Sequence, residues 1–334
     1  MIKTIIVSIL SDHAIPNYLF IKEMEGKYDK LVFITTEYVA NKHIGRNLEQ
    51  ALGVEADTTK RILVSNDDYS STMKTMSEQM LDKECQYVVN ITGGTKVMSL
   101  AIFDFFREFA SVRFVYVPIG RNVYCDVKSG EDHPLNYRVT LKEYFALYGM
   151  TYKSRTTFAQ PSRVTNAFFD RLRQSGFRTP PEIRNAQEHE DTAMRSYYSG
   201  GWFEEYTYSR IKKEKGLKER QIAMSLKIFR DKSQVNDNEI DVAFVFENAL
   251  YVIECKYTMF GYGREPHATI EEYLYKLAAI CKDLGLIVNP YLFTLHPMGR
   301  LSEASMGNLK KRMRILGIKG IVGRKELKYD NLTF

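Results

Sequence analysis

Short apolar runs alternate with amphipathic segments over the first 127 residues. The apolar runs are expected as strands, at Lys3–Leu10, Leu31–Thr35, Arg61–Val64, Tyr87–Ile91, Arg113–Val117 and Val123–Val127. Segments with helical spacing lie between them, at Tyr18–Glu25, Val39–Leu52, 70–84 and Val97–Phe109. Such alternation is typical of a mostly parallel sheet with helices on both faces. The pattern therefore predicts a doubly wound α/β domain.

Three polar loops of this domain are candidates for a binding site, because ligands of parallel sheets bind at the carboxyl ends of strands. Ser11–Asn17 follows the first strand, Thr35–Glu37 ends the second, and Thr92–Lys96 follows the fourth. The last loop combines two glycines, a helix start and a lysine, which together favour an anion such as phosphate. A tight strand-to-helix turn would also account for the glycine pair Gly93-Gly94.

The pattern loosens between residues 141 and 196. Helices are expected at Leu141–Tyr148 and Val164–Gln174, with Ser-, Thr- and Pro-containing loops around them. Such composition is typical of a region between domains. The chain is therefore expected to hold a first domain at 1–140, a linker with short helices at 141–196 and a second domain at 197–334.

A predicted hairpin dominates the second domain. Its strands are Ile240–Phe246 and Leu250–Lys256, both rich in β-branched and aromatic residues, with turn chemistry at 247–249. A helix from Gly201 to about Lys215 and a strand at Ala223–Phe229 are expected before the hairpin. A helix at 269–284 and a strand at Pro290–Leu295 are expected after it. The pattern predicts a second α/β domain.

Three charged residues interrupt this apolar hairpin: Asp241, Glu254 and Lys256. Since side chains alternate along a strand, Glu254 and Lys256 share a face, and the turn brings Asp241 near Glu254. Unpaired buried carboxylates are costly, so their presence indicates a site. Carboxylates are ligands of Mg²⁺, and an ammonium would orient water or neutralise charge in phosphoryl chemistry. An ordinary Glu–Lys pair on a partly exposed strand is the alternative.

Composition and charge narrow the class of protein. Hydrophobic content of 44% with 26% charged residues is that of a folded globular chain. No apolar run reaches the roughly 20 residues that span a bilayer, so no membrane association is expected. Four scattered cysteines without a CxxC pair indicate a reduced, cytoplasmic compartment and no zinc site. The net charge of +6 and the basic stretch from Lys310 to Lys328 are compatible with a nucleic-acid partner.

The first half resembles the CARF domain of CRISPR-associated proteins. The resemblance rests on NITGGTKVMS at 90–99 and SILSDHAIPN at 8–17. It implies a Rossmann-like sensor of cyclic oligoadenylates, with cyclic tetra-adenylate preferred, and a homodimer that shares one symmetric ligand. The residues that it implies for the ligand site are Ser11, Asp12, Asn17, Thr35, Thr92, Gly93, Gly94, Thr95 and Lys96.

The second half resembles the PD-(D/E)xK nuclease core, a restriction-endonuclease-like α/β fold. Asp241 matches the first acidic position and Glu254-Cys255-Lys256 the E-x-K, although Ile240 replaces the motif's proline. The resemblance implies Mn²⁺ or Mg²⁺ held by Asp241, Glu254 and the backbone carbonyl of Cys255. Lys256 would be the catalytic lysine. Glu204 would be an additional catalytic carboxylate from the preceding helix, with Glu205 as the alternative.

Together the two resemblances imply a cyclic-oligoadenylate-activated, metal-dependent endonuclease of type III CRISPR antiviral defence that cleaves DNA, RNA or both. Two alternatives stay open. One is a ligand-regulated nucleic-acid-binding protein without cleavage. The other is a constitutive DNA-repair or restriction-type nuclease whose first domain only dimerises.

Overall fold

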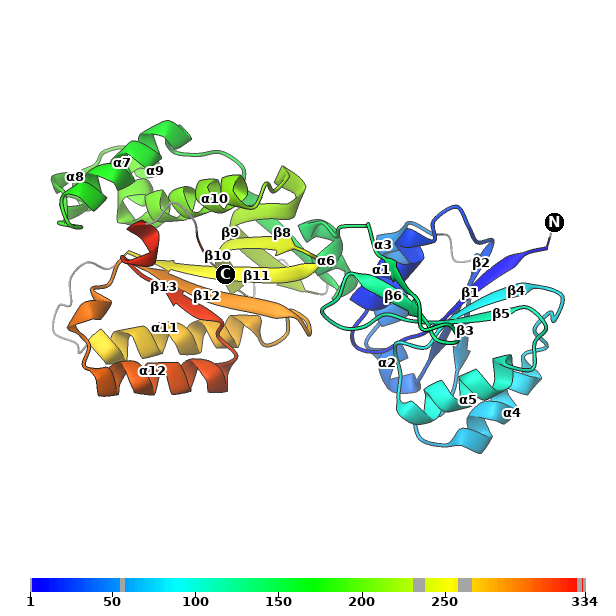
Figure 1. Ribbon diagram of the computed structural model, residues 1–334. Helices are drawn as coiled ribbons and strands as arrows, with labels where there is room; N and C mark the ends of the chain where they lie inside the picture. The colour runs from blue at the N-terminus through cyan, green and yellow to red at the C-terminus, as the bar shows by residue number, and fades with distance from the viewer. Residues whose placement is uncertain (1, 55–57, 231–237, 258–265, 329–331, 333–334) are drawn as a thin grey trace. The chain divides into compact units, whose positions relative to one another are not determined.

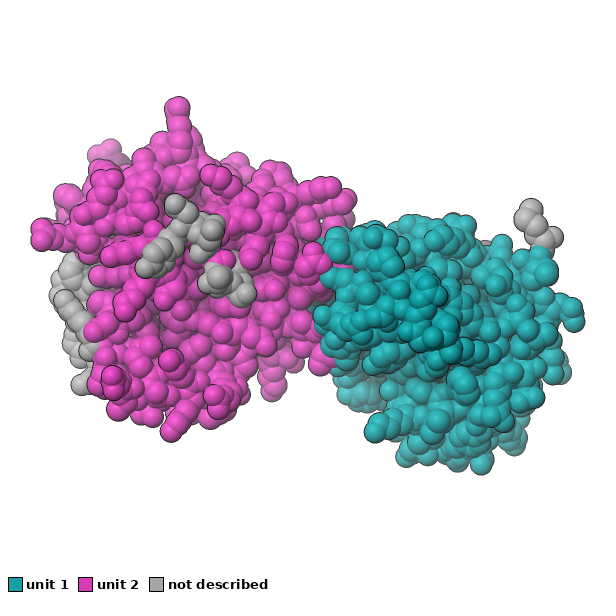
Figure 2. All heavy atoms as spheres, viewed as in Figure 1, with its two compact units in different colours: residues 1–139, 143–150 teal, residues 140–142, 151–334 magenta. Residues whose placement is uncertain are grey.

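The chain forms two compact units, each with its own sheet. The computed structural model describes residues 2–54, 58–230, 238–257, 266–328 and 332. One unit comprises residues 1–139 and 143–150, and the other comprises residues 140–142 and 151–334 (Figure 2). The two predicted α/β sheets are therefore present.

A seven-stranded sheet forms the first unit, in the order β3-β2-β1-β4-β5-β6-β7. The first five strands in this order are parallel, and β6 and β7 are antiparallel additions. The strands are β1 Thr4–Ile9, β2 Lys30–Thr35, β3 Thr59–Leu63, β4 Gln86–Asn90, β5 Val112–Tyr116, β6 Val123–Asp126 and β7 Asp132–Pro134. The prediction of a mostly parallel sheet is confirmed.

Helices cover both faces of this sheet. They are α1 Ile15–Glu23, α2 Glu37–Asn41, α3 Ile44–Leu52, α4 Tyr69–Glu78, α5 Lys96–Phe106 and α6 Leu141–Leu147. Figure 1 shows α1 and α3 on one face and α4 and α5 on the other. Strand order reverses between β1 and β4, the point at which such sheets bind ligands. The single helix expected at 39–52 is two helices, because His43 between them has a left-handed φ of 58°.

The second unit contains a six-stranded sheet, in the order β13-β12-β11-β10-β9-β8. Its strands are β8 Met150–Arg155, β9 Ile222–Arg230, β10 Asn238–Phe246, β11 Ala249–Lys256, β12 Val288–Thr294 and β13 Gly320–Val322. The predicted hairpin is β10 and β11, with Phe246 paired to Ala249. Glu247 and Asn248 between them have φ values of 49° and 62°, the backbone of a type I′ hairpin turn.

Helices sandwich the second sheet as well. They are α7 Ser162–Gln174, α8 Pro181–Arg184, α9 Thr192–Ser196, α10 Trp202–Glu214, α11 Pro266–Cys281 and α12 Glu303–Leu316. Figure 1 shows α7 and α10 on one face and α11 and α12 on the other. The segment expected as a linker thus supplies β8 and α7 to α9, and part of the basic stretch forms α12. Within the described part of the chain, no helix is both long and apolar enough to cross a bilayer.

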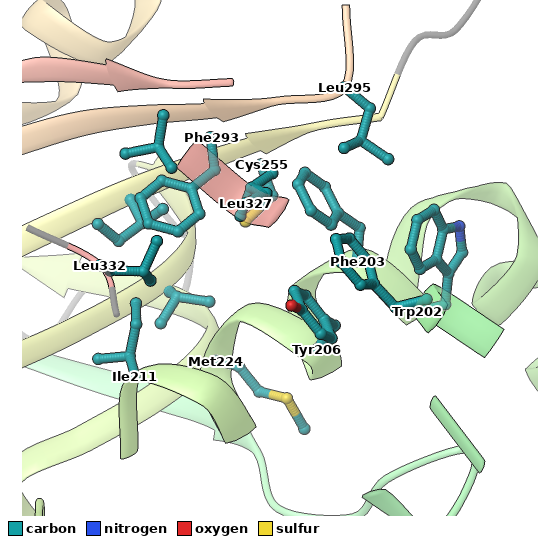
Figure 3. Packing of buried hydrophobic residues seen from close by; sticks show 14 of the residues in the cluster. Trp202, Phe203, Tyr206, Ile211, Met224, Cys255, Phe293, Leu295, Leu327 and Leu332 are labelled. Carbon is teal, nitrogen blue, oxygen red and sulfur yellow. The ribbon is translucent and has the colours of Figure 1, made fainter. Parts of the chain in front are cut away.

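Aromatic packing fixes α10 against the sheet. Trp202, Phe203 and Tyr206 of α10 belong to one buried cluster with Val242 of β10 and Cys255 of β11 (Figure 3). Trp202 and Phe203 are both fully buried. The first turn of α10, which carries Glu204 and Glu205, is therefore held close to the strands of the hairpin.

Candidate functional site

A pocket of about 550 Å³ opens at the carboxyl end of the first sheet. Segments after β1, β2 and β3 line it together with the loop before α5. Of the predicted ligand residues, Ser11, Asp12, Gly94 and Thr95 line this pocket. The pocket lies at the topological switch point, as expected for a ligand site in such a sheet.

The glycine loop before α5 is pressed against the end of β1. A Cβ atom on Gly93 would lie 2.1 Å from the carbonyl oxygen of Ile9, and Gly94 has a φ of 75°. Thr95 caps α5 by accepting a hydrogen bond from the N–H of Met98 at 3.2 Å, and its hydroxyl donates to the Asn66 carbonyl. Both glycines are therefore needed for the shape of the loop, whatever it binds.

The other predicted ligand residues support the pocket from behind or lie beside it. Asn17 is 1% exposed, donates to the Ile9 carbonyl at 3.0 Å and accepts from the Asn90 amide at 2.9 Å. The Thr92 hydroxyl donates to Asn90 and accepts from the Val117 N–H at 2.8 Å. These contacts join α1 to the ends of β1 and β4, and the glycine loop to the segment after β5.

Thr35, Gly93 and Lys96, which were also predicted to contact the ligand, do not line the pocket either. Thr35 is 2% exposed and donates its hydroxyl to the Thr36 carbonyl. Gly93 faces β1, and Lys96 is an exposed residue at the start of α5. The pocket wall after β2 is instead formed by Thr36, Glu37, Tyr38 and Val39.

Two side chains that the sequence motifs did not indicate lie at the pocket. They are Tyr38 of α2 and Lys42, the residue that caps the C-terminal end of α2. Tyr38 lines the pocket and is 62% exposed. The Lys42 ammonium lies 4.3 Å from the Tyr38 ring centroid and 2.7 Å from Asp12 Oδ2. An exposed aromatic ring and an ion pair between Lys42 and Asp12 thus lie at the edge of the pocket. Tyr38 and Lys42 follow closely after β2, and this position at the carboxyl end of a strand is the sequence feature that could have indicated them.

The second unit brings the three charged hairpin residues together. Lys256 Nζ lies 2.5 Å from Glu254 Oε1 and 3.5 Å from Asp241 Oδ2. Backbone pairing of β10 with β11 ends at Val242–Ile253, and the N–H of Cys255 then donates to Asp241 Oδ2 at 2.7 Å. The predicted convergence of Asp241, Glu254 and Lys256 is therefore what the structure shows.

Of the two acidic residues in α10, Glu204 is directed to the hairpin site and Glu205 away from it. Glu204 Oε2 accepts the hydroxyl of Ser225 in β9 at 2.6 Å. Glu205 is fully buried and pairs with Arg155 of β8 at 2.6 Å, and it also accepts the Ala159 N–H at 2.8 Å. The geometry favours Glu204 over Glu205 as the additional carboxylate.

Burial and mutual repulsion shift the ionisation of these groups. Burial, reinforced by Asp241, raises the pKa of Glu204 to about 7. Burial, reinforced by Glu254, raises the pKa of Asp241 to about 6. Burial alone would lower the pKa of Lys256, but Asp241 and Glu254 hold it above its ordinary value. Carboxylates with raised pKa values close to an ammonium are characteristic of functional sites.

A second lysine reaches the site from α11. Lys276 Nζ lies 2.8 Å from Glu254 Oε1, while its side chain remains 55% exposed. Glu254, itself 1% exposed, is thus held between Lys256 and Lys276. Nothing in the sequence marks Lys276, because a lysine on an amphipathic helix is ordinarily a solvated residue.

The oxygen atoms around Lys256 suit a divalent cation. Its ammonium contacts Asp241 Oδ2, Glu254 Oε1 and the Cys255 carbonyl oxygen, the last at 3.3 Å. Three oxygens around one positive charge are a donor set that Mg²⁺ accepts, with water completing its shell. Burial raises the pKa of the Cys255 thiol well above its ordinary value, so the carbonyl is the better ligand. Side chains alone do not complete the set: within the described residues, no three His, Cys, Asp or Glu side chains form a metal cluster.

Known families match both units. A model of the Card1 CARF domain matches residues 5–144, and a model of the Card1-like endonuclease domain matches residues 191–328. No curated protein sequence matches the chain.

Solved structures show the same two-unit fold. Can2 from Sulfobacillus thermosulfidooxidans, solved with cyclic tetra-adenylate, is 25% identical with a TM-score of 0.71, over 98% of this chain and 99% of Can2. Protein VC1899 from Vibrio cholerae is 17% identical with a TM-score of 0.72, over 97% of this chain and 95% of its own. A type III CRISPR defence DNA nuclease activated by cyclic oligoadenylate is 16% identical with a TM-score of 0.57, over 87% of this chain and 45% of its own.

Proposed function

The chain belongs to the Card1-like family, in which a CARF domain is combined with an endonuclease domain, and from this premise we propose that it is a nuclease activated by cyclic tetra-adenylate. Its biological setting is type III CRISPR antiviral defence. The proposal draws on the family and on Can2, which this chain matches over 99% of its length and which was solved with this ligand.

One observation carries the nuclease assignment. Lys256 Nζ contacts two buried carboxylates and a backbone carbonyl at the end of β11, and Glu204 approaches from α10. A Mg²⁺ or Mn²⁺ ion bound there would lower the pKa of water and stabilise charge on the phosphoryl oxygens. Asp241, Glu254 and the Cys255 carbonyl are the residues that would hold it.

Lys256 and Glu204 would act on the phosphate and on water without being ligands of the metal. Lys256, once displaced from the carboxylates, is long enough to neutralise the negative charge that develops on the phosphate. Glu204, whose carboxylate accepts the Ser225 hydroxyl beside this centre, would orient water and accept its proton. Such a centre acts on phosphodiester bonds of DNA or RNA.

The pocket of the first unit is the proposed sensor site. Thr95 at the start of α5 and the exposed ring of Tyr38 offer an anion and a base the contacts that they require. Cyclic tetra-adenylate is rotationally symmetric, so we propose that two chains share one ligand in a homodimer. Ligand binding would then favour one arrangement of the two nuclease units over another.

A cleavage assay tests this function. Labelled single-stranded DNA, double-stranded DNA and RNA are incubated with Mn²⁺ or Mg²⁺ and a panel of cyclic oligoadenylates, with Glu254→Ala as the inactive control. We expect cleavage only with metal and cyclic tetra-adenylate. Binding without cleavage of any substrate would favour a regulator, and cleavage without cyclic nucleotide would favour a constitutive nuclease.

A further inference from the structure

Ser225 has an unusual backbone for the interior of a strand. Six described residues other than glycine have a positive φ, and five of them lie within three residues of a helix end or in the hairpin turn. Ser225, with a φ of 48°, is the sixth and lies in the middle of β9. Left-handed backbone at a residue with a Cβ is strained, and such strain concentrates at functional sites.

The strain occurs at the position in β9 that faces the proposed nuclease centre. The neighbouring pairs Ile240–Leu226 and Val242–Met224 set the register, which places Ser225 opposite Asp241. Within the described ladder, no backbone pair is formed between Ser225 and Asp241 themselves. The regular ladder of β9 and β10 is thus interrupted beside the carboxylate that would hold a metal.

The distorted backbone gives the Ser225 side chain its direction. Met224 packs in the same buried cluster as Trp202 and Phe203 of α10, so strict alternation would turn the next side chain to the other face. The Ser225 hydroxyl instead also reaches α10, donating to Glu204 Oε2 at 2.6 Å. The consecutive side chains of Met224 and Ser225 in β9 are therefore both directed toward α10.

We propose that Ser225 is a positioning residue that holds the Glu204 carboxylate in place beside Asp241. The inference rests on the proposed nuclease function and adds a residue to its centre. A free glutamate side chain has several rotamers, and a proton acceptor must lie within hydrogen-bond reach of the water that it serves. The hydrogen bond from Ser225 selects one orientation, which explains why a strained serine occupies a position where glycine would relieve the strain.

A double-mutant cycle isolates this role. Single-turnover cleavage is measured for wild type, Ser225→Ala, Glu204→Ala and the double variant. Ser225→Ala is expected to lower the cleavage rate about tenfold in wild type and by less than about twofold in Glu204→Ala, because it acts through Glu204. An equal loss in both backgrounds would overturn the proposal.

Ser225→Gly separates positioning from folding. Glycine removes the hydroxyl and the strain together, so the melting temperature should stay equal or rise while the cleavage rate falls as in Ser225→Ala. Glu247→Gly is the matched control, because it relieves a φ of 49° in the hairpin turn and changes no residue of the proposed nuclease centre. It should cleave at the wild-type rate.

Direct binding of Mn²⁺, followed by electron paramagnetic resonance, gives a readout that does not depend on cleavage. We expect Ser225→Gly to bind Mn²⁺ as tightly as wild type, since Asp241 and Glu254 are unchanged. Wild-type cleavage by Ser225→Gly would refute the role of Ser225 and leave the proposed function standing. A wild-type protein that neither cleaves nor binds Mn²⁺ would instead refute the proposed function.

Discussion

The ammonium of Lys256 lies 3.5 Å from Asp241 Oδ2, and it simultaneously contacts Glu254 and the carbonyl of Cys255. A divalent cation held by these oxygens, as proposed, would take the place of this ammonium. Metal and ammonium are therefore expected to compete for the same oxygens.

Lys256→Met tests this competition. Removing the ammonium should leave Mn²⁺ binding as tight as in wild type or tighter, because the three oxygens lose a competitor. Cleavage should nevertheless fall by at least about 100-fold, since the group that we propose neutralises phosphate charge is gone. Calorimetry with Mn²⁺ and a cleavage assay measure the two effects, with Lys60→Met on the first sheet as control. Loss of Mn²⁺ binding in folded Lys256→Met would contradict this account.

Lys276→Gln tests the second lysine. Lys276 holds Glu254 from the side of α11 at 2.8 Å, so its loss should lower cleavage about tenfold, the effect of one charge-assisted hydrogen bond. Lys276→Arg retains a cation and should keep most activity. Lys282→Gln, one residue past the end of α11, is the control and should behave as wild type. Equal activity of Lys276→Gln and Lys282→Gln would show that Lys276 is only a surface residue.

Gly93→Ala tests the loop of the sensor pocket. The new Cβ would meet the Ile9 carbonyl oxygen at 2.1 Å, so the loop must move. We expect a loss of stability of about 1–3 kcal/mol and weaker binding of cyclic tetra-adenylate. Thermal unfolding measures the stability, and calorimetry measures the binding. Gly307→Ala in α12 has open space around the added Cβ and should be neutral or stabilising. Unchanged ligand binding by Gly93→Ala would show that the loop does not shape the pocket.

Arg155→Met tests the pair that joins β8 to α10. Glu205 is fully buried, so removing its partner should cost about 3 kcal/mol of the free energy of unfolding. Arg171→Met removes an arginine that is 63% exposed and paired with Glu182, and should cost less than about 1 kcal/mol. Urea unfolding compares the two. Similar losses for both variants would mean that burial of Glu205 does not control the strength of the pair.

The hairpin and the glycine loop were predictable because local sequence determines them. Asn248 in the turn tolerates a left-handed backbone, and β-branched residues on both sides favour strands. Glu254 and Lys256 share a face by alternation alone. The charged residues that interrupt the apolar hairpin therefore indicate a site from the amino-acid pattern by itself.

Other features depend on contacts between distant segments. The strand β8 carries no clear apolar alternation, and its place in the second sheet comes from pairing that the sequence does not display. Asn17 and Thr92 do not line the pocket, because the Asn17 side chain is bonded to the Ile9 carbonyl and the Thr92 hydroxyl to Asn90. The left-handed backbone of Ser225 and the reach of Lys276 to Glu254 arise from packing around the centre.

The most direct test of the account is the dependence of cleavage on cyclic tetra-adenylate in wild type and in Glu254→Ala, with ligand binding measured in both by calorimetry. We predict that both proteins bind the ligand equally, and that only wild type, with Mn²⁺ and ligand together, cuts labelled nucleic acid. Cleavage by Glu254→Ala, or wild-type cleavage at the same rate with and without the ligand, would contradict it.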